Sequence, residues 1–402
     1  NLRFPRPGWV EMRPSDVWAA VKMVLGRVCT STDEKIEAIA TASFGEAAVL
    51  MDKNGESVCD SIFYTDVRGA DMLDEPRRTV DPVALELRTG MPINYMYTLP
   101  KLMWLRKNRS GALERTGKMM LYGSYVEYML TSVAAIDASL ASRSLMFDRE
   151  RVCWDKEVCE KFGIDLAWLP EFVPAGEIIG KVRPDVADEV GLSRDAVVVS
   201  GVHDQIAAAL GCGAVNEGDI YTILGTTCCT GIVCRGPQTV NEATRFVTHT
   251  EAGQVISLFP MQAGTPNIDW LQQHISLDAD LGRLEQAIAA VEPGSGGVFW
   301  QPYLNGERAP FYSPDARAGF FGISPHTTRA ELQRAVFEGL AFAIVDALQG
   351  YPQGGELYLT GGGAASATWL QIIADCTGRT VVSSAFNELS ARGAAILAAR
   401  SV

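Results

Sequence analysis

One acidic side chain stands where a run of apolar, β-forming residues gives way to alanine and glycine. The segment is VVVSGVHDQIAAALGCGAV, residues 197–215, and the acid is Asp204, between His203 and Gln205. An Asp at a helix start most often only caps the helix, because its carboxylate accepts hydrogen bonds from backbone N–H groups. The positive helix end also favours an ionised carboxylate, which can take a proton from a substrate hydroxyl. Both roles are open for Asp204.

Two glycine-rich segments of the second half are suited to bind phosphate. In ILGTTCC, Gly225 lets the backbone approach an anion closely, and Thr226 and Thr227 offer donors, although an ordinary turn is the alternative. In LTGGGAASATW, glycines 361–363 separate a strand from a helix whose N-terminus favours phosphate. No P-loop motif occurs, and Ser366 replaces the third glycine of a dinucleotide fingerprint, so both of those sites are disfavoured.

A second acid, Glu46, follows a predicted strand and lies beside Gly45 in TASFGEAAVLMD. A lone loop Glu is most often solvated, but as a partner of Asp204 it could bind sugar hydroxyls, which pair well with carboxylates. The histidines other than His203 show no ligand spacing and the nine cysteines form no CxxC, so neither a zinc site nor a disulfide framework is predicted.

The elements that must position these residues alternate between strand and helix in both halves, which predicts an α/β protein. In the first half we expect a helix over 15–29 with Ser15 as N-cap. Strand, turn and strand follow in IEAIATASF and AAVLMDKNGESV, with Asn54-Gly55 as the hairpin signal, and residues 98–147 are mainly helical.

In the second half, AVVVSG predicts a buried strand before a small-residue helix, and IYTILG and TGIVC predict a hairpin around residues 225–227. TTRAELQRAVFEGLAFAIVDALQG predicts a long helix, and ELYLTGGG and SATWLQIIADCTG predict a strand and the helix after it. The Pro-, Gly- and charge-rich stretch 164–195 places a domain boundary near its end, which gives domains 1–196 and 197–402.

Composition excludes several classes of function. A chain of 402 residues that is 47% hydrophobic and 21% charged can bury two cores. The net charge of −13 argues against a nucleic-acid partner, because such binders usually carry a basic face. No apolar run is long enough for a membrane helix and no signal peptide is visible, so we expect a cytoplasmic protein without a membrane partner.

Taken in order, HDQ, GTT, YLNGERAPFYSPDARAGFFGIS and LTGGGAASATWLQIIADCTGRTV resemble the FGGY carbohydrate kinases. The resemblance extends over PGWVEMRPSDVW, YTDVRG, MYTLPKLMWL and ASRSLMFDRERVCWD, and so spans nearly the whole chain. It implies two actin-like (ribonuclease H-like) domains flanking a deep cleft, with residues 1–196 on the sugar side and 197–402 on the nucleotide side. It also implies transfer of the γ-phosphoryl group of ATP, with Mg²⁺, to a hydroxyl of a small sugar.

The resemblance assigns site residues position by position. Asp204 matches the general base. The implied substrate contacts are Glu46, Tyr97, His203 and Gln205, and no metal ligand is assigned. The implied nucleotide contacts are Gly225, Thr226, Thr227, Gly264, Gly362, Gly363 and Ser366.

Departures from the family pattern bear on the acceptor. The stretch SFGEA matches an Arg-Glu pair in glycerol kinases and Met-His in xylulose kinases, and here it is Gly45-Glu46. Met96 stands where glycerol kinases place a Tyr that contacts the substrate. We predict a ketopentose acceptor such as xylulose. The alternatives are a polyol kinase of the glycerol or erythritol type, which Glu46 favours, and a catalytically inactive sugar-binding sensor on the same fold.

The sensor reading is supported by two family segments that this sequence lacks. One is the first strand with its phosphate hairpin, and the other is helical sequence beyond GAAILAARSV. We expect both segments to belong to the protein outside residues 1–402, since a sheet without its first hairpin exposes an unpaired edge. A homodimer is common among such kinases, although no segment here identifies an interface.

Overall fold

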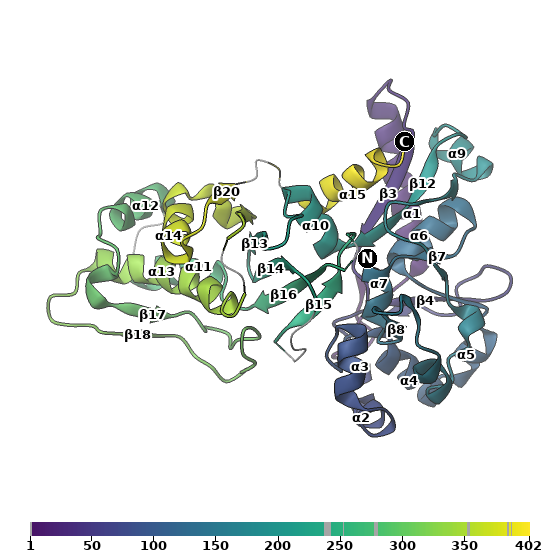
Figure 1. Ribbon diagram of the computed structural model, residues 1–402, viewed down its shortest axis with the longest axis horizontal. Helices are drawn as coiled ribbons and strands as arrows, with labels where there is room; N and C mark the ends of the chain where they lie inside the picture. The colour runs from purple at the N-terminus through teal and green to yellow at the C-terminus, as the bar shows by residue number, and fades with distance from the viewer. Residues whose placement is uncertain are drawn as a thin grey trace.

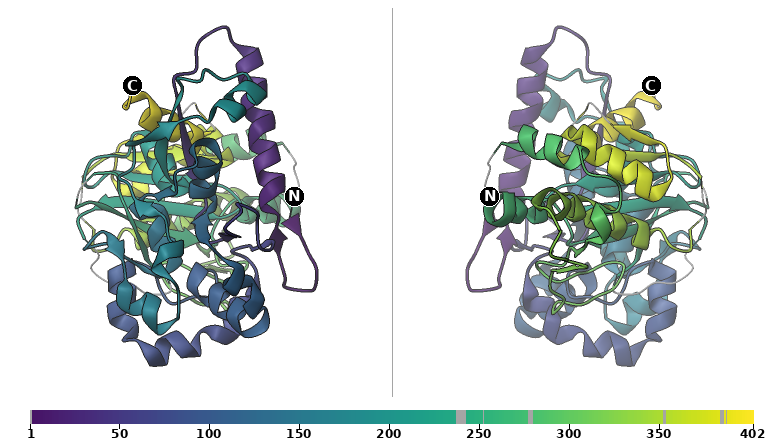
Figure 2. Two further views of the ribbon diagram at one scale, coloured as in Figure 1. Left: turned by 90° about the vertical axis from the view of Figure 1, so that its right-hand side faces the viewer. Right: turned by 90° about the vertical axis from the view of Figure 1, so that its left-hand side faces the viewer.

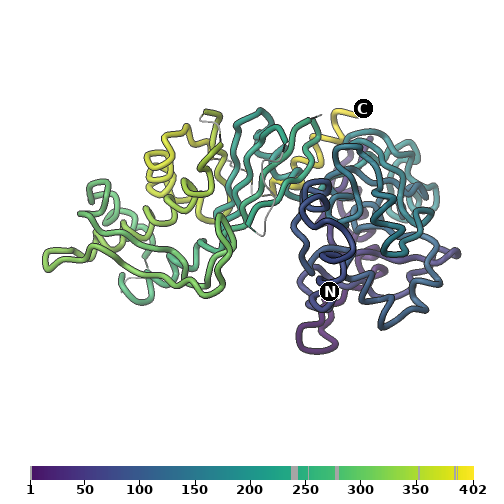
Figure 3. The backbone as a smooth tube through the Cα atoms, turned by 60° about the horizontal axis from the view of Figure 1, so that its bottom comes forward, coloured from purple at the N-terminus to yellow at the C-terminus, as the bar shows by residue number. Residues whose placement is uncertain are grey.

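The chain forms an elongated molecule whose two halves lie at opposite ends (Figure 1). The computed structural model describes residues 2–236, 243–251, 253–276, 280–351, 354–383, 386 and 388–402. In the tube view, the purple and blue half and the green and yellow half meet in a narrower middle region (Figure 3). Helices and strands alternate throughout, so the predicted α/β class is confirmed.

The first half contains many short elements. Its helices are α1 (Pro14–Ser31), α2 (Asp74–Thr79), α3 (Pro82–Thr89), α4 (Thr98–Asn108), α5 (Ser110–Arg115), α6 (Tyr122–Thr131), α7 (Ala138–Ala141), α8 (Lys156–Lys161) and α9 (Pro184–Val190). Its strands are β1 (Leu2–Arg3), β2 (Glu11–Met12), β3 (Ala38–Ser43), β4 (Ala48–Met51), β5 (Ser61–Ile62), β6 (Lys118–Leu121), β7 (Ala135–Ile136), β8 (Phe147–Asp148), β9 (Cys153–Trp154), β10 (Glu171–Phe172), β11 (Ile178–Lys181) and β12 (Val197–His203).

Two local predictions for this half need correction. Helix α1 begins at Pro14 with Arg13 at the N-cap, and not behind Ser15, because the fixed φ of proline suits the first helical position. The turn at Asn54-Gly55 forms, but an isolated bridge between Met51 and Ser57 stands in place of the predicted second strand, and β4 pairs with the distant β6. End-on views show α1 as a long helix along the outside of this half (Figure 2).

The sheet that carries the candidate residues is β11-β12-β3, with β12 in the middle. Strand β12 begins at residue 197, where we predicted the second domain to begin, yet it pairs in parallel with β3 and antiparallel with β11 of the first half. His203 at the end of β12 pairs with Ser43 at the end of β3. Because parallel strands end at one sheet edge, the segments that follow them, with Asp204 and Glu46, emerge side by side.

Strand β3 has no strand partner on its other side among the described residues. A groove beside it is lined by apolar side chains of α1 and β3, including Val17, Val21, Leu25 and Ile39.

A buried acid supports the irregular join between β3 and β12. The register of the two strands shifts between Val199 and Val202. Glu127 of α6 fills this place, and its Oε1 accepts hydrogen bonds from Thr41 Oγ1 at 2.6 Å and from the N–H of Gly201 at 2.8 Å. Burial raises the pKa of Glu127 from 4.5 to about 8, although these hydrogen bonds oppose the rise. Glu127 is therefore protonated in the folded protein at neutral pH.

The raised pKa of Glu127 predicts a loss of stability at high pH. The folded protein keeps a proton that the unfolded chain releases above 4.5, so this stabilisation is full below pH 4.5 and is lost as pH rises through about 8. Between about pH 5.5 and 7.5, wild type should lose roughly 2 kcal/mol more unfolding free energy than Glu127→Gln. Urea unfolding of both proteins at the two pH values measures this difference. An equal pH dependence in the two proteins would show that Glu127 is ionised when folded.

The second half is built on a six-stranded sheet in the order β15-β16-β14-β13-β19-β20. Its helices are α10 (Asp204–Cys212), α11 (Pro266–Leu271), α12 (Leu281–Ala289), α13 (Arg329–Ala347), α14 (Ala367–Thr377) and α15 (Leu389–Ala399). Its strands are β13 (Ile220–Leu224), β14 (Cys228–Cys234), β15 (Arg245–Thr248), β16 (Val255–Met261), β17 (Phe299–Gln301), β18 (Gly319–Phe321), β19 (Leu357–Thr360) and β20 (Val381–Ser383).

The local predictions for the second half are confirmed. Strands β13 and β14 form the predicted hairpin, in which Leu224 pairs with Cys228. Helix α13 matches the predicted long helix and begins with a capping box between Thr328 and Glu331. Helix α15 returns to pack against α10 and β3, so the C-terminal segment lies beside the first sheet (Figure 1). In the described part of the chain, no helix has the length and apolar character needed to cross a bilayer.

Candidate functional site

Residues of both halves line one pocket of about 290 Å³, the Asp204 pocket. Its walls come from the segments after β3 and β12 and from the hairpin and strands of the six-stranded sheet. The lining residues that carry polar groups are Glu46, Tyr64, Arg143, His203, Asp204, Gln205, Thr227, Cys229, Arg245 and Arg308. The topology thus brings Glu46, His203, Asp204 and Gln205 together, as the sequence led us to expect.

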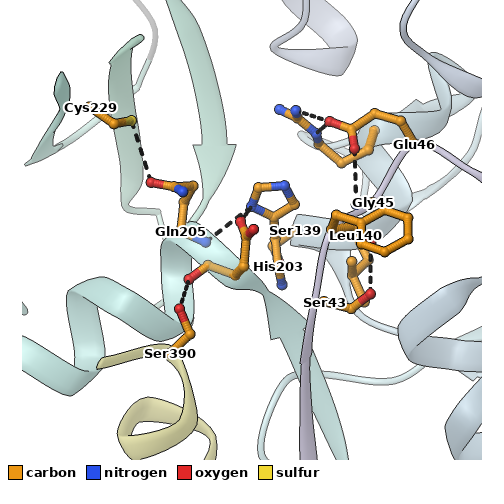
Figure 4. Close-up of polar contacts among 12 residues, drawn as sticks. Ser43, Gly45, Glu46, Ser139, Leu140, His203, Gln205, Cys229 and Ser390 are labelled. Carbon is orange, nitrogen blue, oxygen red and sulfur yellow. Dashed lines mark hydrogen bonds and ion pairs between the residues drawn. The ribbon is translucent and has the colours of Figure 1, made fainter. Parts of the chain in front are cut away.

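Asp204 does not cap its helix. It is the first residue of α10, and the N-cap is His203, whose extended backbone precedes the helix and whose Nδ1 accepts from the N–H of Gln205 at 3.3 Å. The Asp204 side chain is 41% exposed, and its buried oxygen, Oδ1, lies 3.1 Å from His203 Nδ1. Ser390 of α15 holds only the main-chain carbonyl of Asp204, at 3.0 Å (Figure 4). The exposed part of the carboxylate can therefore meet a ligand in the Asp204 pocket.

His203 positions this carboxylate. Its Nδ1 lies 3.1 Å from Asp204 Oδ1, so it either donates to the carboxylate or accepts from Gln205, and cannot do both. Burial lowers the pKa of His203 below 6.5, although Asp204 opposes the change, so the ring is neutral at pH 7. The N–H of His203 is held by Ser139 Oγ at 2.9 Å (Figure 4). Its backbone and ring are thus fixed beside Asp204.

Gln205 offers one side-chain donor. Its Oε1 accepts from the hydroxyl of Tyr221 at 3.2 Å. It also accepts from the thiol of Cys229 at 3.4 Å (Figure 4). These contacts orient the amide so that Nε2 is left to donate to an oxygen in the pocket.

The sequence reasoning missed Arg143, which pairs with Glu46. Arg143 Nε donates to Glu46 Oε1 at 2.9 Å, and Nη2 bonds the same oxygen. Both side chains are buried, and the N–H of Gly45 donates to the other oxygen of Glu46 at 3.1 Å. Burial alone would raise the pKa of Glu46, but Arg143 and His203 lower it to about 2. Glu46 is ionised, and its charge is balanced by Arg143.

Gly45 makes room for this arginine. A Cβ at position 45 would lie 2.5 Å from Cγ and 2.9 Å from Cβ of Arg143, which is too close for any other residue. The arginine that pairs with Glu46 is therefore Arg143, which is distant in sequence, and not the residue next to Glu46. The only sequence signal for the pair is the glycine itself, since the two residues are 97 positions apart.

Tyr97 lies outside the lining of the Asp204 pocket. It is fully buried at 0% exposure, and its hydroxyl accepts from Arg245 Nε at 3.1 Å. Its ring lies 5.2 Å from the guanidinium of Arg143. The neighbouring Met96 lines the pocket in its place. Tyr97 therefore supports two arginines of the pocket wall.

A second pocket of about 410 Å³, the Gly362 pocket, lies in the second half. Gly362, Gly363 and Ser366 line it together with Thr265 and Trp369. Ser366 is the N-cap of α14, and its side chain accepts from the N–H of Trp369 at 3.2 Å. The structure thus groups three of the predicted nucleotide residues in one cavity.

The Gly-Thr-Thr hairpin lies between the two pockets. Thr227 lines the Asp204 pocket, and the carbonyl of Gly225 accepts at 2.9 Å from the N–H of Thr265, which lines the Gly362 pocket. Gly264 packs directly on this hairpin, because a Cβ there would lie 2.6 Å from the Gly225 oxygen and also collide with Thr226. A phosphate chain that bridges the two pockets would pass along the hairpin.

Comparison with known proteins covers both halves. The model of the N-terminal domain of the FGGY family of carbohydrate kinases matches residues 1–211, and that of its C-terminal domain matches 220–402. A xylulose kinase of Lactococcus lactis is 28% identical, over 99% of this chain and 81% of its own. A glycerol kinase of Paenarthrobacter aurescens is 29% identical, over 99% and 82%. The crystal structure of xylulose kinase from Rhodospirillum rubrum superposes with a TM-score of 0.90 at 26% identity, over 99% and 83%.

Proposed function

Because the chain belongs to the FGGY family of carbohydrate kinases, which are ATP-dependent phosphotransferases, we propose that it phosphorylates a hydroxyl of a ketopentose such as xylulose. The similarity to xylulose kinases over nearly the whole chain supports this acceptor. The observation that carries the proposal is the carboxylate of Asp204, which is 41% exposed and lines a pocket that also contains Thr227 of the hairpin.

In this reaction Asp204 accepts the proton of the attacking hydroxyl. Gln205 Nε2 and the Glu46–Arg143 pair bind the other sugar oxygens, and the Gly225–Thr227 hairpin faces the phosphates. The Gly362 pocket holds the adenosine part of ATP. Phosphoryl transfer needs mainly an in-line nucleophile and neutralised charge, and closure around the pocket would exclude water that hydrolyses ATP.

Mg²⁺ belongs to the proposal as the partner of ATP. Within the part of the chain that the structure describes, no group of three or more His, Cys, Asp or Glu side chains could hold a metal ion. The partly exposed carboxylate of Asp204 is a single carboxylate ligand, which fits an ion held mainly by substrate phosphates and water. When bound, the ion neutralises phosphate charge.

The Glu46–Arg143 pair favours a second candidate, a polyol kinase of the glycerol or erythritol type. In glycerol kinases the matching arginine and glutamate are adjacent in sequence. Here Arg143 and Glu46 form such a pair in space, beside Asp204. A glycerol kinase at 29% identity is in keeping with this alternative.

Coupled ADP-release assays with pentuloses, hexuloses, gluconate, glycerol and erythritol test the proposal. Release that depends on a ketopentose, with the highest kcat/KM of the panel, supports it. Highest kcat/KM with glycerol or erythritol would support the polyol alternative. Saturable sugar binding without any ADP release would contradict both and support a sensor.

Filling the Gly362 pocket should weaken ATP use selectively. A Cβ at Gly362 meets no atom within 4 Å, so Gly362→Leu should fold and place its side chain in the cavity. We expect the KM for ATP to rise by about 10-fold or more, with the KM of the acceptor nearly unchanged, since buried contacts of a cofactor are lost. The matched control is Gly111→Leu, where a Cβ also meets open space but far from this pocket. An unchanged KM for ATP would place the nucleotide elsewhere.

A further inference from the structure

Two arginines of the Asp204 pocket have no carboxylate partner among the described residues. Arg245 begins β15, and Arg308 lies in the segment between β17 and β18. Arg245 Nη1 and Arg308 Nε are buried without a hydrogen-bond partner in the described part of the chain. Buried guanidinium donors without acceptors are costly, because they lose their hydration without compensation.

The charges around these arginines do not balance. Glu46 is neutralised by Arg143, and His203 is neutral, so Asp204 is the only uncompensated carboxylate that lines the pocket. Arg245 and Arg308 line the same pocket, and they also repel each other. Burial has the largest effect in lowering the pKa of Arg308, and the charge of Arg245 has the next largest. Among the lining residues, two arginines thus face one uncompensated carboxylate. Glu307, whose charge also acts on Arg308, lies outside the lining, and its carboxylate accepts from four backbone N–H groups.

The guanidinium of Arg245 and the backbone at Arg308 are held before any ligand binds. Arg245 Nε donates to the hydroxyl of the buried Tyr97 at 3.1 Å. Arg308 follows Glu307, whose carboxylate accepts from the N–H groups of Gln262, Ala263, Arg308 and Ala309. Such anchoring leaves the remaining N–H groups as preorganised donors.

We infer that Arg245 and Arg308 form a subsite for an oxyanion in the Asp204 pocket. The inference rests on the proposed function only for the identity of the anion. With a neutral ketopentose the anion is the transferring phosphoryl group, which must reach the hydroxyl that Asp204 activates. With a sugar acid it is the carboxylate of the acceptor. Guanidinium groups suit both, because their N–H donors match phosphate and carboxylate oxygens.

A binding experiment without turnover tests the subsite. Inorganic sulfate at constant ionic strength should raise the Tm of wild type in a saturable way, because it binds the folded state. Arg245→Gln and Arg308→Gln should abolish most of this shift, and Arg245→Lys, which keeps the charge, should retain part of it. The matched control is Arg329→Gln at an exposed position, which should keep the wild-type Tm shift. Absence of the shift in wild type, or its full persistence in both pocket variants, would overturn the inference.

Kinetics distinguish the two sources of the anion. If it is the phosphoryl group, each Gln variant should lower kcat by about 10- to 100-fold on both D-xylulose and D-gluconate, with little change in acceptor KM. If it is a carboxylate, the KM for D-gluconate should rise by about 10-fold or more while kcat/KM for D-xylulose is kept. Kinetics equal to wild type on both acceptors would again overturn the inference. Failure of the proposed function, with no turnover on any acceptor, leaves the sulfate result intact.

Discussion

Asp204→Asn should lower kcat by about 10²-fold or more, because the amide cannot accept the proton of the acceptor hydroxyl. The substitution keeps the shape of the side chain, and the bond from Ser390 to the main-chain carbonyl of residue 204 is unaffected. The Gly362 pocket is built from other elements, so the KM for ATP should change by no more than about 2-fold. Steady-state kinetics with the preferred acceptor, together with ATP binding, measure both quantities.

The matched control is Asp81→Asn, which makes the same chemical change at another helix start. Asp81 does cap its helix, α3, and its side chain accepts from the N–H groups of Val83 and Ala84. Asn is an equally good cap, so both stability and kcat should stay near wild type. Near-normal turnover of Asp204→Asn would leave Asp204 with a structural role only.

What the sequence revealed about this site was local. The strand and helix around Asp204, the Gly225–Thr227 hairpin and the turn at 361–363 each depend on short stretches whose residue types set the backbone. The family resemblance added the expectation that these segments serve one site. The sequence left open whether Asp204 caps the helix, and the structure gives the cap to His203, because the alternation of residue types does not say where a strand ends.

What the sequence could not reveal was long-range. Arg143 meets Glu46 only because the segment that begins with α7 lies beside the end of β3. Arg245 reaches Tyr97 across 148 positions, and no periodicity connects the two. The partners of β12 could not be predicted either. Strands β3 and β11 flank it on both sides, so a domain boundary at residue 197 would divide this sheet. Hydrophobic pattern predicts that a strand is buried, but not which strand it pairs with.

Arg143→Met should destabilise the protein by about 3–5 kcal/mol, the usual cost of breaking a buried ion pair by removing one partner. The methionine fills most of the space, but the carboxylate of Glu46 is left buried without the two N–H donors that hold it. The acceptor KM should rise as well, since the pair lines the Asp204 pocket. Urea unfolding gives the stability, and Arg329→Met at an exposed position is the control.

Two further measurements separate loss of the pair from loss of packing. In wild type the pKa of Glu46 is lowered from 4.5 to about 2, so its stabilisation is present above 4.5 and is lost as pH falls through 2. Without Arg143, burial dominates and raises that pKa, so Arg143→Met should be less destabilised at about pH 4 than at about pH 7. Adding Glu46→Gln should recover at least about 1 kcal/mol at neutral pH, because the amide carries no charge to bury. A double variant no more stable than Arg143→Met, with a pH-independent loss, would mean that the arginine contributes by packing alone.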